Sequence, residues 1–145
     1  MEKIDIFNFR TRIEKGVKSE IPNIDLITNT LFSKGLVRKE YGLCAEPFDK
    51  CFCFCDIDYR GVSCVKNPLS TTQINITVNH NTSTRKKRIY YYSIDIFYID
   101  GFYYLCCLAQ SSFYKSSIGA KHTVYKAKEN EISMIINEIF NDIEV

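Results

Sequence analysis

The strongest constraint on the fold of this chain is the pair Asp100–Gly101, which separates two runs of aromatic and β-branched residues. The run before it reads RIYYYSIDIFYI and the run after it reads FYYLCCLAQ. Asp-Gly is favoured in the two-residue turns that join neighbouring antiparallel strands. We therefore expect a β-hairpin in which Tyr98 lies opposite Tyr103 and Ile96 opposite Leu105.

This register divides the hairpin side chains between two faces. One face is apolar apart from its tyrosine hydroxyls and continues through Ile94 and Cys107, so we expect it to face the core. The other face is mixed, yet it carries Phe97, Phe102 and Tyr104. That is more apolar surface than a solvated face requires, and we interpret these rings as candidates for contact with a partner.

Further strands flank the hairpin. In TQINITVNH, Ile74, Ile76 and Val78 alternate with polar residues, which predicts a half-buried strand. A short strand is also expected around HTVYK, after a serine-rich stretch. Together these patterns predict about four to six antiparallel strands within residues 50–126.

Helical spacing of apolar residues predicts helices near both ends of the chain. The expected helices cover residues 4–15, 23–34 and 130–143. Alternation at Ile4 and Ile6 leaves a strand as an alternative for the first of them. Asn23 is a suitable N-cap for the second helix, and Gly35 followed by Leu36 fits a Schellman-type end. The chain is thus expected to be a single α+β domain, residues 1–145, with helices packed on one sheet face.

The bulk composition excludes several classes of protein. The net charge of +2 over 145 residues is too small to indicate nucleic-acid binding by itself. No apolar run approaches the ~20 residues of a membrane helix, and the N-terminus does not resemble a secretory signal. We expect a cytoplasmic protein with reduced cysteines, from a genome rich in A/T codons.

The stretch KCFCFC places three cysteines at alternate positions with a phenylalanine in each gap. In a strand Cys51, Cys53 and Cys55 point one way, and Phe52 and Phe54 the other. The favoured interpretation is a central strand covered on both faces, with cysteine acting as a small buried apolar residue.

A metal site is the alternative interpretation of these cysteines. Its candidate ligands are Cys51, Cys53, Cys55 and Cys64. Thiols two residues apart on a regular strand are expected ~6.5–7 Å apart, whereas two sulfurs on one zinc lie under ~4 Å apart. We therefore expect no metal there unless the segment leaves the strand conformation, and we expect no cofactor.

No catalytic constellation is evident. The two histidines, His80 and His122, are the available bases for a cysteine nucleophile, but the local signatures of cysteine–histidine enzymes are absent. The scattered glycines form no phosphate-binding loop. We expect no enzymatic activity.

A basic run, RKKR, precedes the three tyrosines of the first hairpin strand. Three interpretations stay open: a solvated loop, a protein interface anchored by tyrosine and arginine, and a site for single-stranded nucleic acid. The candidate partner-binding residues are Arg85, Lys86, Lys87, Arg88, Tyr91, Phe97, Phe102 and Tyr104.

These patterns favour a small interaction protein that binds another macromolecule and blocks it sterically, as immunity proteins and phage-encoded inhibitors do. The expected partner is a protein, with a second copy of the chain as an alternative. A nucleic-acid-binding module is the second hypothesis, and a zinc-binding or thiol-dependent protein is the third.

Overall fold

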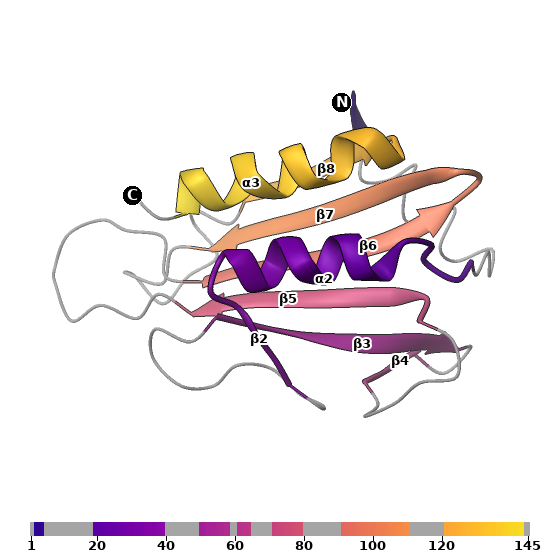
Figure 1. Ribbon diagram of the computed structural model, residues 1–145, viewed down its shortest axis with the longest axis horizontal. Coiled ribbons are helices and arrows are strands. Elements are labelled where there is room, and N and C mark those ends of the chain that lie inside the picture. The colour runs from indigo at the N-terminus through magenta and orange to yellow at the C-terminus, as the bar shows by residue number, and fades with distance from the viewer. Residues whose placement is uncertain are drawn as a thin grey trace, which may run out of the picture.

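The fold is an open sheet covered on one face by two helices (Figure 1), which confirms the predicted α+β class. A computed structural model describes residues 2–4, 19–39, 50–58, 61–64, 71–79, 91–110 and 121–143. The helical elements are α2 (Ile24–Ser33), the short 3₁₀ helix η1 (Glu129–Glu131) and α3 (Ile132–Ile143). The strands are β1 (Glu2–Ile4), β2 (Val37–Arg38), β3 (Lys50–Asp58), β4 (Gly61–Cys64), β5 (Gln73–Asn79), β6 (Tyr91–Ile99), β7 (Phe102–Gln110) and β8 (Lys121–Ala127).

The described residues form a sheet of eight strands in the order β1-β8-β7-β6-β5-β3-β2, with β4 pairing to the remaining part of the β3 edge. Every pairing is antiparallel except that of β2 with β3. The sequence predicted four to six strands. The additional ones, β1, β2 and β4, are two to four residues long. Strands of this length are too short to show a clear alternation of apolar and polar residues, so they could not be predicted from the sequence.

The predicted hairpin is confirmed in register as well as in type. Tyr98 lies opposite Tyr103, Ile96 opposite Leu105, and the ladder continues to the ends of β6 and β7. The turn residues have positive φ, 52° at Asp100 and 85° at Gly101. That conformation suits the right-handed twist of the strands, and it explains why Asp-Gly predicts the structure so well.

Helix α2 ends as predicted but begins differently. The Gly35 N–H donates to Phe32 O at 3.0 Å and the Leu36 N–H to Leu31 O at 3.2 Å, which is a Schellman turn with Gly35 at φ 83°. At the other end, Asn23 occupies the N-cap position with φ 53° and makes no capping side-chain bond. Its amide donates to Glu129 instead, so Asn23 connects α2 to the start of the C-terminal helical segment.

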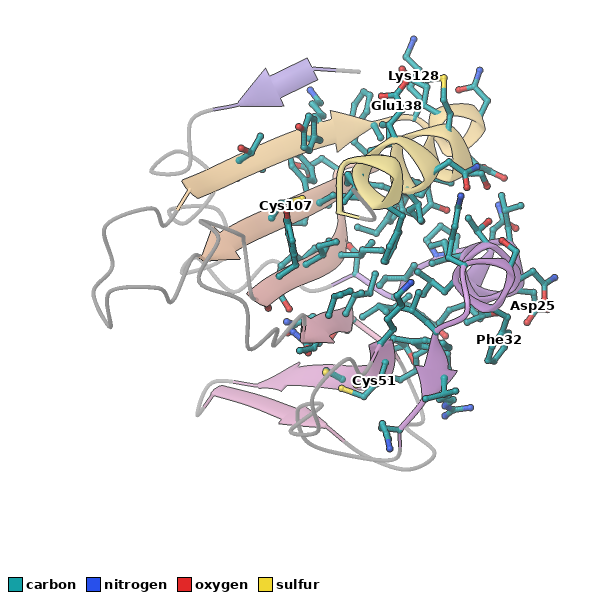
Figure 2. All side chains as sticks on the ribbon, turned by 90° about the vertical axis from the view of Figure 1, so that its left-hand side faces the viewer. Asp25, Phe32, Cys51, Cys107, Lys128 and Glu138 are labelled. Carbon is teal, nitrogen blue, oxygen red and sulfur yellow. The ribbon has the colours of Figure 1, made fainter. Side chains whose placement is uncertain are left out.

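The C-terminal helix matches the prediction for residues 130–143. It begins with η1, where the Glu131 carboxylate accepts the Lys128 N–H at 3.0 Å, and continues as α3. Helices α2 and α3 lie side by side on the same sheet face (Figures 1 and 2), and the hydroxyls of Thr30 and Ser133 are 3.2 Å apart across them.

The main core lies between these helices and the sheet. Its strand residues are those that the alternation assigned to the apolar face, and its helix residues are those at helical spacing. The buried members are Ile21, Ile27, Leu31, Leu36, Phe52, Phe54, Ile74, Ile76, Val78, Ile94, Ile96, Tyr103, Leu105, Ala127, Ile132, Ile135, Ile136 and Phe140.

One predicted helix falls outside this description. Of residues 4–15, the structure describes Ile4, the last residue of β1. The helix expected there stays a prediction. Among the described residues, no helix has the length and hydropathy needed to cross a bilayer.

Candidate functional site

The sheet face opposite the helices has a different composition from the core face. At its β6–β8 side it forms a second apolar cluster of Phe97, Ile99, Tyr104 and Val124. No residue of α2 or α3 belongs to this cluster. Of the rings that the sequence assigned to the second hairpin face, Phe97 and Tyr104 are members of this cluster, and Phe102 packs against it.

Next to this cluster lies a group of polar side chains, the polar centre, formed by Gln73, Asn75, Thr77 and Asp95. Asp95 Oδ1 accepts hydrogen bonds from Gln73 Nε2 and Asn75 Nδ2, both at 2.7 Å. Burial raises the pKa of the Asp95 carboxyl, and the two hydrogen bonds oppose that shift. Gln73 Oε1 is buried without a hydrogen-bond partner. An unpaired buried acceptor lowers stability. An additional group that bound this oxygen would therefore complete the hydrogen bonding of the polar centre.

The cysteines of β3 border the polar centre. Phe52 and Phe54 lie in the main core. Cys51, Cys53 and Cys55 are 2%, 1% and 0% exposed, and the antiparallel register puts them opposite Thr77, Asn75 and Gln73. The prediction of a strand buried on both faces is confirmed, but β3 lies next to the edge of the described sheet and not at its centre.

The expected spacing of the thiols is wrong. The Sγ atoms of Cys53 and Cys55 lie 3.7 Å apart, although both residues are in a paired strand. The ~6.5–7 Å expectation follows the rise of the backbone, and the side chains can lean toward each other from positions that far apart. A regular strand can therefore bring two sulfurs close enough for one ion.

The expectation that all the cysteines are reduced is also wrong. Cys51 is disulfide-bonded, whereas Cys53, Cys55, Cys106 and Cys107 form no disulfide. The side chain of the cysteine bonded to Cys51 is not among the described ones. The side chain of Cys64 is not described either. Disulfides are more typical of oxidising compartments than of the cytosol.

Two further thiols lie on β7. Burial raises the pKa of Cys107 to about 12, and the Asp95 charge adds to the shift. Burial and the Asp95 charge also raise the pKa of Cys106. Both thiols stay protonated at neutral pH, which makes them poor nucleophiles. Within the described residues, no group of three or more His, Cys, Asp or Glu side chains could share a metal ion.

Of the side chains predicted to bind a partner, the structure describes those of Phe97, Phe102 and Tyr104, so the predicted site as a whole stays a prediction. Arg85, Lys86, Lys87 and Arg88 lie outside the described residues, and Tyr91 begins β6 with its side chain outside them. Of the three rings, Phe97 is 8% exposed and Tyr104 is fully buried. Phe102 is partly buried, with Lys126 Nζ 4.1 Å from its ring centroid.

A more accessible aromatic site lies at the β2 edge of the sheet. We call it the aromatic–basic corner and define it as Phe32, Arg38, Phe52 and Phe54. Phe32 is 52% exposed, and its ring meets Phe52 edge-on with the centroids 5.3 Å apart. The Arg38 guanidinium carbon lies 4.2 Å from the Phe54 ring centroid.

The local sequence explains how this corner is assembled. The Schellman turn at Gly35 ends α2 and directs the chain into β2, which places Arg38 opposite Phe52 on β3. Figure 2 shows Phe32 on the flank of α2 that faces away from α3. This corner was not predicted from the sequence because Phe32 lies 20 positions before Phe52 and 22 before Phe54. The available signal was FSKGLVRK, which holds three cationic residues, one aromatic residue and no acid.

No protein-family model, curated protein or solved structure matches the chain.

Proposed function

We propose that this protein binds another protein and blocks it sterically, using the aromatic–basic corner as the centre of the contact. The observation that carries the proposal is the half-exposed ring of Phe32 supported by Phe52, with Arg38 beside it over Phe54. Aromatic residues and arginine are enriched at protein interfaces and in the hot spots that dominate binding energy.

The contacts within the corner favour binding because they hold its side chains before a partner arrives. The edge-on contact restrains the Phe32 ring, and the stacked position restrains the long Arg38 side chain. Ordering such side chains at an interface costs about 0.5–1.5 kcal/mol each. A pre-ordered corner avoids part of that cost.

The sequence segment from Phe32 to Lys39 is basic, and this favours an acidic partner. Lys34, Arg38 and Lys39 follow Phe32 within eight residues, and no carboxylate lies among them. A protein surface with carboxylates around an apolar depression would complement both the exposed aromatic ring and the basic residues. Such a contact forms faster and more tightly at low ionic strength.

The test compares matched variants against one partner. That partner is first isolated from native host extract with the tagged full-length chain and then purified. We expect Phe32→Ala and Arg38→Gln each to weaken its binding about ten-fold or more in calorimetry, as a hot-spot residue does.

Two exposed residues serve as matched controls. Leu26 is 42% exposed on the same helix but lies about 120° around its axis from Phe32. Lys128 is an exposed cation next to η1. We expect Leu26→Ala and Lys128→Gln to leave affinity unchanged. Equal losses in variants and controls would contradict the proposed surface, and failure to isolate any partner would contradict the proposed function.

The nucleic-acid hypothesis is tested separately. A fluorescent mixed-sequence single strand is titrated with the chain at low and physiological salt. Binding that falls steeply with salt and is lost when Arg85, Lys86, Lys87 and Arg88 are replaced by Gln would replace the protein partner by a nucleic acid.

A further inference from the structure

The disulfide of Cys51 can be assigned a partner by elimination. The chain has seven cysteines, and Cys51 is bonded to one of the others. Among the described side chains, those that form no disulfide are Cys53, Cys55, Cys106 and Cys107. The partner is therefore Cys44 or Cys64.

Cys64 lies too far along the sheet to be that partner. It is opposite Cys55 in the antiparallel pair of β3 and β4, four residues along β3 from Cys51. Four residues of a strand span ~13 Å, whereas the Cα atoms of a disulfide lie within ~7 Å of each other. Cys44, which lies outside the described residues and seven positions before Cys51, is the cysteine that remains.

The register places the bond of Cys51 beside the aromatic–basic corner. Cys51 is opposite Val37 of β2, and the next pair along the two strands is Arg38 with Phe52. The Lys39 N–H donates to Phe52 O at 2.8 Å. Because β2 is an edge strand of two residues, few backbone hydrogen bonds can hold it to β3. Its position then depends on how the chain that follows it is anchored.

We propose that a disulfide between Cys44 and Cys51 holds β2 against β3 and thereby positions Arg38 over Phe54. Residues 39–49 join these two parallel strands, and the bond leaves only residues 39–43 between β2 and the cross-link. A shorter connection has fewer conformations in which β2 is separated from β3. The effect on partner binding rests on the proposed function of the corner, whereas the pairing of the two cysteines does not.

The first test identifies the disulfide in the full-length chain, purified under oxidising conditions. The denatured chain is treated with N-ethylmaleimide at mildly acidic pH, which suppresses thiol–disulfide exchange, and the modified cysteines are identified by mass spectrometry. We expect every cysteine except Cys44 and Cys51 to be modified. Cys44→Ser should make Cys51 reactive, and the matched variant Cys64→Ser should leave it protected. Modification of Cys51 in wild type, or a peptide that joins it to another cysteine, would overturn the pairing.

The second test measures the position of Arg38 by NMR without a partner. The Arg38 guanidinium carbon lies 4.2 Å from the Phe54 ring centroid, so the ring current should shift the nearby side-chain protons upfield. We expect Cys44→Ser to lose at least half of this shift while the amide signals of β6 and β7 stay dispersed. Cys64→Ser should keep the wild-type shift.

Two results of the NMR test would overturn the positioning role. One is an Arg38 signal that is the same in wild type and Cys44→Ser. The other is a loss of dispersed signals from the whole sheet of Cys44→Ser, because the disulfide would then be required for the entire fold and not for β2 in particular.

The third test measures the affinity of each variant for the isolated partner. Cys44→Ser should bind it about ten-fold or more weakly than wild type, and Cys64→Ser should bind it equally well. Unchanged affinity in a Cys44→Ser chain whose Arg38 shift is lost would contradict the corner as the contact surface. Since the first two tests need no partner, failure to isolate one would contradict the proposed function and leave the disulfide to be decided by them.

Discussion

The aromatic–basic corner and the β6–β7 hairpin are both rich in aromatic residues, but they differ in how much of each ring is exposed. At the corner, Phe32 is 52% exposed beside a restrained arginine. In the hairpin, Tyr104 is fully buried and Phe97 nearly so. Aromatic content alone therefore does not identify an interaction surface.

The difference arises from where each ring lies, because the hairpin rings are on strands inside the sheet and Phe32 is on helix α2 near the sheet edge. The hairpin occupies central positions, with β5 on one side and β8 on the other. The corner lies where α2 ends and the two-residue strand β2 forms the sheet edge. At that edge the Phe32 ring can pack against Phe52 on one side and still contact solvent on the other.

The largest effect should follow from truncating the hairpin ring that the structure buries most completely. Tyr104→Ala removes a side chain of the cluster with Phe97, Ile99 and Val124. We expect it to lower the free energy of unfolding by about 3–5 kcal/mol in urea titrations. A loss below about 1 kcal/mol would mean that this face is not packed as described.

The next largest effect on stability is expected from the Asp95 carboxyl, which lies on the same hairpin face as Tyr104. Because burial raises the Asp95 pKa above 3.8, the folded chain keeps a proton that the unfolded chain has lost, and stability falls as the pH rises from 3.8 through the folded pKa. Asp95→Asn removes this dependence. We expect the variant to gain stability relative to wild type as the pH rises from 4 to 7, measured by urea unfolding at several pH values. Parallel curves for the two proteins would show that Asp95 titrates normally.

A smaller loss is expected where the other hairpin face meets α2. The Tyr103 hydroxyl donates to Pro22 O at 2.8 Å, which connects β7 to the residues before the helix. Tyr103→Phe deletes this hydrogen bond while keeping the ring, so it should cost about 1 kcal/mol. Burial, with the Glu129 charge, raises the pKa of Tyr103 to about 12, so its ionisation should be absent from absorbance titrations up to pH 10. A normal tyrosine titration at this position would contradict the buried contact.

The smallest change in stability should come from the corner itself. Phe32→Ala exchanges a half-exposed ring for a methyl group and should cost less than about 1 kcal/mol, mostly from the lost contact with Phe52. Thermal unfolding measures the cost. We expect this nearly neutral variant to fail to bind a partner that binds Leu26→Ala.

Much of the fold could be predicted from the sequence because its signals are local. Asp100–Gly101 determined the hairpin register, and Gly35 marked the end of α2. Alternation at Ile74, Ile76 and Val78 assigned the core face of β5. Each inference depends on residues within one element or one turn.

The candidate sites were harder to predict because they depend on tertiary position. Nothing in the sequence indicates that Phe32 and Phe52 meet, or that the Cys53 and Cys55 side chains lean together. The disulfide at Cys51 was missed for a similar reason, since pairing depends on distance in space and not on spacing in sequence.

Hydrogen–deuterium exchange of the chain with and without its isolated partner shows whether the aromatic–basic corner or the hairpin forms the contact. We propose that the corner forms it. We predict slower exchange in residues 31–39 and 50–54 of the complex, with the strands on either side of Asp100–Gly101 unchanged. Protection centred on residues 97–104, with the corner exchanging as in the free chain, would contradict the account.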